Sequence, residues 1–210
     1  MDEWGEGPGQ ARERIVAAIA RTLAREGAPV VVALDGGSGA GKSTLAAWIE
    51  AAFDTASIPL DDFFAADIPD REWDAFTVGK KLARAFDWAR VRAEAIEPLL
   101  GGKRARWHAF DFASGPRPDG TYGMEAAAKE REPADVILIE GAYSAGPALA
   151  DVVDLAILVD VPVAERHARL RSREEAAFLA QWHARWDAVE AHYYHEVRPR
   201  ESFDLVVGGR

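Results

Sequence analysis

A glycine-rich stretch, GGSGAGKST at residues 36–44, has the residue types and spacing that hold a phosphate group. Its glycines allow backbone N–H groups to point at a phosphate, and the positive end of a following helix adds to the attraction. A lysine in this pattern reaches the β- and γ-phosphates, while the next hydroxyl residue holds Mg²⁺. We therefore expect ATP and Mg²⁺ to bind at Gly36, Gly37, Ser38, Gly39, Ala40, Gly41, Lys42, Ser43 and Thr44.

Two sets of carboxylates follow apolar runs and suggest what happens to that phosphate. Asp61 and Asp62 follow the run at 56–60, and Glu140 closes the run VILIE. Carboxyl ends of parallel strands line the ligand crevice of an open sheet, where a carboxylate can orient or deprotonate a hydroxyl. The more ordinary alternative for the aspartate pair is a helix cap or a solvated loop.

Other uses of a bound nucleotide fit less well. The chain has no Asn, so it lacks the Asn-Lys-x-Asp stretch with which GTPases recognise guanine. Glu140 is a lone carboxylate, and the next residue is Gly141. Glu140 and Ser43 can hold Mg²⁺, but no second carboxylate follows Glu140 that could obviously activate water. We therefore expect phosphoryl transfer to the hydroxyl of a bound small molecule, with water kept out of the site.

The elements that must position these residues alternate between helices and apolar strands. Helical patterns cover about 10–26, 42–53, 70–101 and 163–195. Strand-like runs lie at about 30–34, 56–60, 105–112, 135–141, 153–161 and 203–207, and 114–123 is a loop rich in Gly and Pro. This alternation predicts an α/β fold with a doubly wound parallel sheet and helices on both faces.

The composition restricts the other properties of the chain. The 210 residues suit one domain, and a formal charge of −10 argues against a nucleic-acid partner. No apolar run approaches the length of a membrane span, no signal peptide is evident and there is no cysteine. We expect a cytoplasmic protein with no membrane partner; the sequence does not indicate its oligomeric state.

Several short motifs, in order along the chain, resemble the uridine kinase branch of P-loop kinases, to which phosphoribulokinase and pantothenate kinase are related. They are GGSGAGKST, LDDFF, FDW, FDF and ILIEGAY, and the resemblance extends from about residue 30 to residue 207. It implies a P-loop NTPase fold formed by the whole chain, 1–210. An N-terminal helix (1–28), an acceptor-binding region (61–123) and a helical lid with its following helix (163–195) would be its parts.

The resemblance also implies roles for individual residues. Asp61 matches the catalytic base, Asp87 matches an aspartate that binds sugar hydroxyls, and Glu140 matches the carboxylate that supports Mg²⁺. The remaining acceptor-site residues would be Asp62, Phe63, Phe110 and Asp111. Arg166, Arg169 and Arg173 match arginines of the lid that close over the phosphates, although a solvated basic helix face is the alternative.

The acceptor is less well specified than the phosphate chemistry. Uridine kinases read the base with a tyrosine and a histidine, and the matching positions here are Phe110 and Gly115. A nucleoside is the leading expectation for the acceptor. The alternatives are a kinase for another hydroxyl metabolite, such as a pantothenate-like acid, and a non-catalytic ATP-binding regulator. Acceptor-dependent ADP production would distinguish them.

Two further features have alternative interpretations. Four aromatic residues fall close to one helix face: Phe178, Trp182, Trp186 and Tyr193. They could pack in the core, or they could form an aromatic wall that contacts the ring of an acceptor. Asp35, immediately before the glycine-rich stretch, is expected to satisfy local backbone donors.

Overall fold

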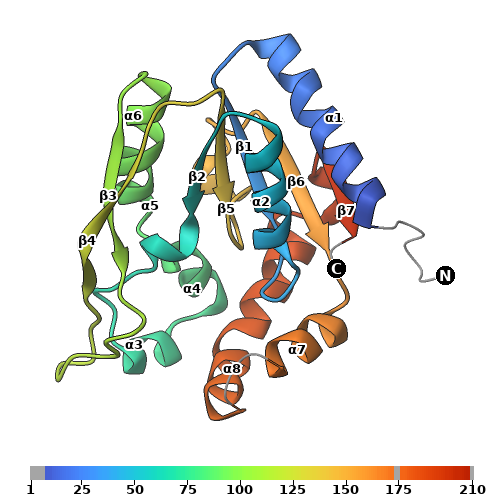
Figure 1. Ribbon diagram of the computed structural model, residues 1–210. Helices are drawn as coiled ribbons and strands as arrows, with labels where there is room; N and C mark the ends of the chain where they lie inside the picture. Colours follow the sequence, from blue (N-terminus) through green and yellow to red (C-terminus); the bar gives the residue numbers. More distant parts are fainter. Residues whose placement is uncertain (1–7, 173–175, 209–210) are drawn as a thin grey trace.

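The computed structural model describes residues 8–172 and 176–208 (Figure 1). Its centre is a five-stranded parallel sheet in the order β2-β5-β1-β6-β7. The strands are β1 Val30–Asp35, β2 Thr55–Pro59, β5 Val136–Glu140, β6 Leu155–Asp160 and β7 Leu205–Gly208. The expected α/β fold with a parallel sheet is therefore confirmed.

Both faces of the sheet are covered, because successive side chains of a strand point to opposite faces. Val30, Val32 and Leu34 of β1 pack in one core with α1 Pro8–Glu26 and α2 Lys42–Ala52. Val31 belongs to the core on the other face, together with residues of the helices after residue 87. Figure 1 shows α1 and α2 together on one side of the sheet.

The segment between β2 and β5 forms a separate layer beside the sheet. It starts with the 3₁₀ turn η1 Leu60–Phe63, followed by α3 Asp70–Ala75 and α4 Val78–Arg84. A continuous helical stretch then comprises α5 Trp88–Arg90, η2 Val91–Ile96 and α6 Glu97–Leu100. Strands β3 Ala105–Phe110 and β4 Met124–Arg131 pair antiparallel with each other and stand apart from the central sheet (Figure 1).

Two helices near the C-terminus lie beyond the carboxyl ends of the central strands (Figure 1). They are α7 Val163–Arg171 and α8 Ala176–His192. Short turns complete the chain: η3 Pro147–Leu149, η4 Tyr193–Val197 and η5 Arg200–Ser202. No helix within 8–172 and 176–208 combines the length and apolar character needed to cross a membrane.

Candidate active site

The glycine-rich stretch lies where β1, the central strand, turns into α2. Gly39 and Gly41 have φ of 80° and 91°, in the left-handed region that favours glycine. A Cβ at Gly37 would overlap Nη1 of Arg166 and lie 2.8 Å from Oε2 of Glu190, so the ends of these two side chains would have to shift. The loop therefore combines backbone conformations that favour glycine with close packing against α7 and α8.

Lys42, at the first position of α2, is buried and turns back over the loop. Its Nζ donates to the carbonyl oxygens of Gly36 at 2.8 Å and Gly37 at 3.3 Å. A cavity of about 270 Å³ lies beside it. Lys42, Ser43, Thr44, Asp61, Glu140 and Arg169 are among the residues that line this cavity, which we call the phosphate cavity.

The phosphate cavity contains oxygen atoms that can ligate a divalent cation. The Ser43 hydroxyl and the carboxylates of Asp61 and Glu140 all line it. Burial raises the pKa of Glu140, and the negative charge of Asp61 raises it further, while Lys42 lowers it. Hard oxygen ligands are those that Mg²⁺ prefers, and a cation would relieve the repulsion between the two carboxylates, so the residues fit Mg²⁺.

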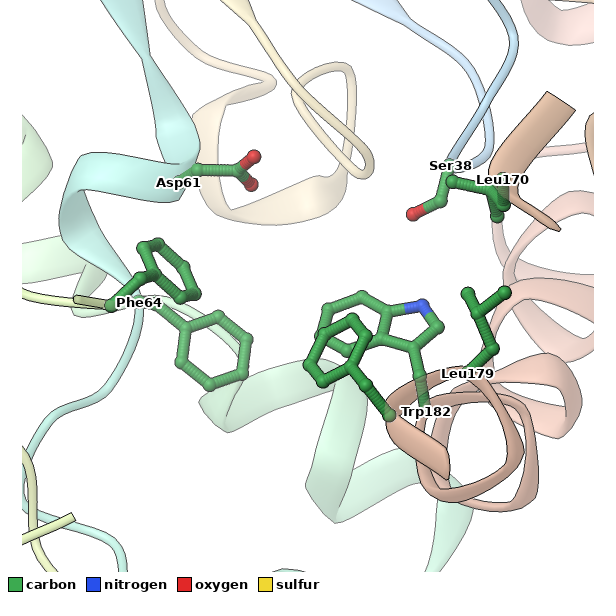
Figure 2. A pocket seen from close by; sticks show the side chains of 8 residues that line it. Ser38, Asp61, Phe64, Leu170, Leu179 and Trp182 are labelled. Atoms are coloured by element: carbon green, nitrogen blue, oxygen red, sulfur yellow. The ribbon is translucent and has the colours of Figure 1, made fainter. Parts of the chain in front are cut away.

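Asp61 lies in η1, directly after β2, and also lines a second cavity of about 470 Å³. The two cavities share Ser38, Asp61 and Leu170. Figure 2 shows the carboxylate of Asp61 and the hydroxyl of Ser38 on opposite sides of this second cavity, with Phe64 and Trp182 below them in the view. We call it the acceptor cavity; Phe112, Phe178 and Leu179 complete its lining.

Asp62 and Phe63 point away from both cavities, into the layer formed by β3 and β4. Asp62 accepts hydrogen bonds from Nε1 of Trp107 at 2.8 Å and from Nζ of Lys129 at 2.7 Å. Phe63 is fully buried, with its ring centroid 5.6 Å from that of Trp107. This geometry gives both residues a structural function, and a contact with the acceptor stays a prediction.

The other predicted acceptor residues also have partners within the protein. Asp87 accepts from the backbone N–H of Arg90 at 3.1 Å and caps α5. Asp111 accepts from Ser114 and from the backbone of Ala113, and the Ser114 hydrogen bonds lower the pKa of Asp111. Phe110 is buried against other aromatic rings. None of the three lines the two cavities, and their predicted functions remain untested.

The predicted lid arginines have different environments. Arg169 lines the phosphate cavity and donates to the carbonyl oxygen of Gly39 at 3.3 Å. Arg166 is buried, donating to the carbonyl of Ser38 at 3.0 Å and to the carboxylate of Glu190 at 2.8 Å. This arrangement suits a residue that positions the loop; a direct contact with phosphate stays a prediction. Arg173 lies outside the described residues.

Asp35 has far more partners than the local donors that were expected. Its buried carboxylate accepts from the adjacent backbone N–H of Gly36, but also from the backbone of Tyr143 and Ala145. The hydroxyls of Tyr193 and Tyr194 donate to it at 2.7 and 2.9 Å. Burial raises its pKa despite these donors.

The aromatic residues of the last long helical region fall into two groups, one packed in the core and one lining a cavity. Trp186 is buried in the core, and so is Tyr193 just beyond the helix end. Phe178 and Trp182 line the acceptor cavity instead. Glu190, on the same helix, was not recognised from the sequence, where nothing links it with a loop more than 150 residues earlier.

Comparisons with known proteins agree with this geometry. The model of the phosphoribulokinase/uridine kinase family matches residues 31–177. A search of curated protein sequences finds no match.

Solved structures with the same fold cover nearly the whole chain. A possible uridine kinase from Bacillus stearothermophilus has a TM-score of 0.66 at 17% identity, over 93% of this chain and 97% of that one. A candidate fructose transport system kinase from Silicibacter sp. TM1040 has a TM-score of 0.60 at 24% identity, over 93% and 98%. A D-glycerate 3-kinase from Cryptococcus neoformans has a TM-score of 0.60 at 13% identity, over 97% and 96%.

Proposed function

The chain belongs to the phosphoribulokinase/uridine kinase family of small-molecule kinases, and we propose that it transfers the γ-phosphoryl group of ATP to a hydroxyl held beside Asp61. One observation carries the proposal. Asp61 lies at the junction of the phosphate cavity and the acceptor cavity, which also share Ser38 and Leu170. A hydroxyl in the acceptor cavity can therefore approach a phosphate bound at the start of α2, while Asp61 accepts the proton of that hydroxyl or orients the hydroxyl.

The residues of the phosphate cavity would each have a distinct function. Backbone N–H groups of the loop and Lys42 would bind the β- and γ-phosphates, and Arg169 would add positive charge from α7. Ser43 and Glu140 would hold Mg²⁺, with Asp61 nearby. Mg²⁺ bound there would neutralise charge that develops on the phosphate oxygens during transfer.

We propose a nucleoside as the first acceptor class to test. It is a neutral primary alcohol with a ring, and the acceptor cavity of about 470 Å³ is lined by the rings of Phe64, Phe112, Phe178 and Trp182. Asp61 would face the sugar hydroxyl and the aromatic residues would face the base. A pantothenate-like acid is the alternative, because it too ends in a primary alcohol.

The proposal is tested by ADP release from Mg²⁺-ATP with single acceptors. The panel contains uridine, cytidine, purine nucleosides, pantothenate and ribulose 5-phosphate. Asp61→Asn is expected to lower kcat by about 10²–10⁴-fold, as when a general base is lost, while ATP binding is unchanged. Asp67→Asn, an exposed aspartate outside both cavities, is the matched control and should retain wild-type kcat. Wild-type turnover by Asp61→Asn would refute the assignment.

A further inference from the structure

We infer that the protein has a further metal site, outside the phosphate cavity, in which His167, His183 and Asp187 bind a divalent transition-metal ion such as Zn²⁺. His167 belongs to α7, whereas His183 and Asp187 belong to α8. A metal ion bound there would therefore link the two helices. The inference is independent of the proposed function, because neither ATP nor an acceptor takes part in it.

Two of the three ligands come from one face of α8. His183 and Asp187 are four residues apart, so their side chains lie on the same face of the helix. Nδ1 of His183 lies 3.0 Å from Oδ1 of Asp187. A spacing of four residues is also the one at which the two histidines of an HExxH helix reach a shared zinc ion. The pair is thus placed to contribute two ligands to one ion.

The third ligand comes from α7, which lies beside α8 beyond the carboxyl ends of the central strands (Figure 1). Nε2 of His167 lies 3.6 Å from the same Oδ1 atom of Asp187. The imidazole rings of His167 and His183 have centroids 3.9 Å apart and an interplanar angle of 40°. Three side chains that commonly ligate transition metals therefore meet at one point.

The distances are close to those around a four-coordinate Zn²⁺ ion. Ligand atoms that lie about 2.0–2.1 Å from a tetrahedral centre are separated from one another by about 3.3 Å. The two distances to Oδ1 of Asp187, 3.0 and 3.6 Å, lie on either side of that value. The candidate ligand atoms of all three residues lie within 4.8 Å of one another. Rotation of the two imidazole rings would therefore bring the three atoms to bonding distance of one ion.

Hydrogen bonding alone explains only part of the cluster. His183 is within hydrogen-bond distance of Asp187, at 3.0 Å. The distance of 3.6 Å between His167 and the same carboxylate is too long for a hydrogen bond. A metal ion would engage His167 as well, because it binds the carboxylate and both imidazole nitrogens at once.

Water can complete the coordination of such an ion. The side chains of His167 and His183 are each 22% exposed, and that of Asp187 is 44% exposed. Asp187 also lines a cavity of about 360 Å³. Three protein ligands with water in the fourth position form a four-coordinate zinc site. An ion from solution can therefore reach the three ligands in the folded protein.

The ligand types distinguish this site from that of the catalytic cation. Imidazole nitrogen suits Zn²⁺, Cu²⁺ and Ni²⁺, whereas Mg²⁺ prefers oxygen ligands in octahedral geometry. The candidate ligands in the phosphate cavity, Ser43, Asp61 and Glu140, offer oxygen alone. Zn²⁺ and Mg²⁺ are therefore suitable probes for telling the two sites apart.

The site adjoins the ion pair that holds the tip of the glycine-rich loop. His167 directly follows Arg166, and Asp187 precedes Glu190 by three residues. Arg166 and Glu190 bind each other and the backbone of Ser38. A bound ion would fasten α7 to α8 next to this contact. We therefore expect Zn²⁺ to stabilise the folded protein in the absence of ATP.

The first experiment measures Zn²⁺ binding to protein that has been freed of metal with a chelator and dialysed. Isothermal titration with ZnCl₂, without nucleotide, should show saturable binding that includes one Zn²⁺ ion per chain at this site. At a free Zn²⁺ concentration about a hundredfold above the dissociation constant, Tm should rise by about 5–10 °C. MgCl₂ should give no rise in Tm that depends on the histidines. Absence of Zn²⁺ binding would overturn the inference.

Matched variants locate the binding. His167→Gln and His183→Gln should each weaken this Zn²⁺ binding at least about tenfold, because even a residue that only orients a metal ligand contributes about 10–100-fold. His192→Gln is the control, since His192 pairs with Glu196 at the same four-residue spacing on α8 but lies outside the cluster. An equal effect of His192→Gln would indicate adventitious binding by surface histidines and overturn the inference.

A spectroscopic probe tests whether both helices supply ligands. Co²⁺ added to the metal-free wild-type protein should produce the visible absorption of a four-coordinate ion, and both His167→Gln and His183→Gln should lose it. Loss in His183→Gln alone would place the ion on α8 and overturn the link between the helices. These readouts do not involve ADP release, so they stand or fall separately from the proposed kinase function.

Discussion

The buried ion pair between Arg166 and Glu190 holds the tip of the phosphate-binding loop, and its removal gives a sharp prediction. Nη1 of Arg166 lies 2.8 Å from Oε2 of Glu190 and donates to the carbonyl of Ser38 at 3.0 Å. The N–H of Ser38 donates to Oε1 of Glu190 at 2.9 Å. Both backbone groups of Ser38 are therefore bound by the pair, and Glu190→Ala should loosen the loop and destabilise the protein.

The magnitude follows from the burial of the two side chains. Arg166 is 6% exposed and Glu190 is 8% exposed, so the alanine variant leaves a guanidinium in a site with little water. Removal of one partner from a buried ion pair costs about 3–5 kcal/mol. Arg166 retains its bonds to the carbonyls of Ser38 and Val161, so we expect a loss of about 3 kcal/mol. In a chain of this size that corresponds to a fall in Tm of about 6–12 °C.

Urea unfolding followed by tryptophan fluorescence gives the free energy of unfolding, and titration with ATP gives the effect on the loop. Glu190→Ala should lower both the unfolding free energy and the affinity for ATP. The double variant Arg166→Met/Glu190→Leu should be more stable than Glu190→Ala, because an apolar pair can replace a buried ion pair at little cost.

The control is Asp67→Ala, which removes the exposed partner of Arg84 and should cost less than about 1 kcal/mol. If Glu190→Ala also lost less than about 1 kcal/mol, the pair would not be desolvated as its burial indicates. If ATP affinity were unchanged in a variant that lost about 3 kcal/mol of unfolding free energy, the pair would stabilise the fold without positioning the loop.

Three further changes test the site. Lys42→Ala should abolish transfer, measured as ADP release, because it removes the cation beside the loop carbonyls of Gly36 and Gly37; full activity would contradict the loop assignment. Burial raises the pKa of the Glu140 carboxyl above its ordinary value of 4.5, so the folded state binds the carboxyl proton more tightly than the unfolded state does. The free energy of unfolding contributed by Glu140 therefore falls as the pH rises above about 4.5. Glu140→Gln should therefore raise Tm at pH 7 without Mg²⁺, yet require more Mg²⁺ for turnover; a lower Tm would contradict this sign. Tyr194→Phe removes a 2.9 Å hydrogen bond to the carboxylate of Asp35 and should cost about 1.5–3 kcal/mol in urea unfolding, whereas Tyr122→Phe, with a 3.4 Å bond to Asp70, should cost less.

The central sheet could be predicted because its strands are continuous apolar runs, such as VVVAL and VILIE, that remain apolar on both faces. The strand β4 was missed for the opposite reason. Its sequence, MEAAAKER, has mostly exposed or half-exposed side chains and no apolar alternation, so only pairing with β3 defines it. The strand-like run at 105–112 was found, but its sequence did not indicate that it would pair outside the central sheet.

The candidate site likewise has one part that the sequence predicts and another that it does not. The residues predicted to bind phosphate, 36–44, lie together in one short motif, so their types and spacing are visible in the sequence. The acceptor cavity is assembled from the loop at Ser38, from η1, from the loop after β3 and from α7 and α8. Which of the aromatic residues of α8 face that cavity depends on the packing of Trp186 against Phe64 and Trp73, contacts between segments more than 100 residues apart.

Helix α8 lines the acceptor cavity and also contacts the glycine-rich loop. Its first half supplies Phe178, Leu179 and Trp182 to the acceptor cavity. Its second half supplies Glu190 to Ser38, and Tyr193 and Tyr194 directly beyond it bind Asp35 at the start of the loop. The loop is thus held at its start and its tip by residues of the segment that also lines the acceptor cavity. Because a packed helix moves largely as a unit, a displacement of α8 by the acceptor would change the environment of Ser38. The same helix therefore contacts both the acceptor cavity and the tip of the phosphate-binding loop.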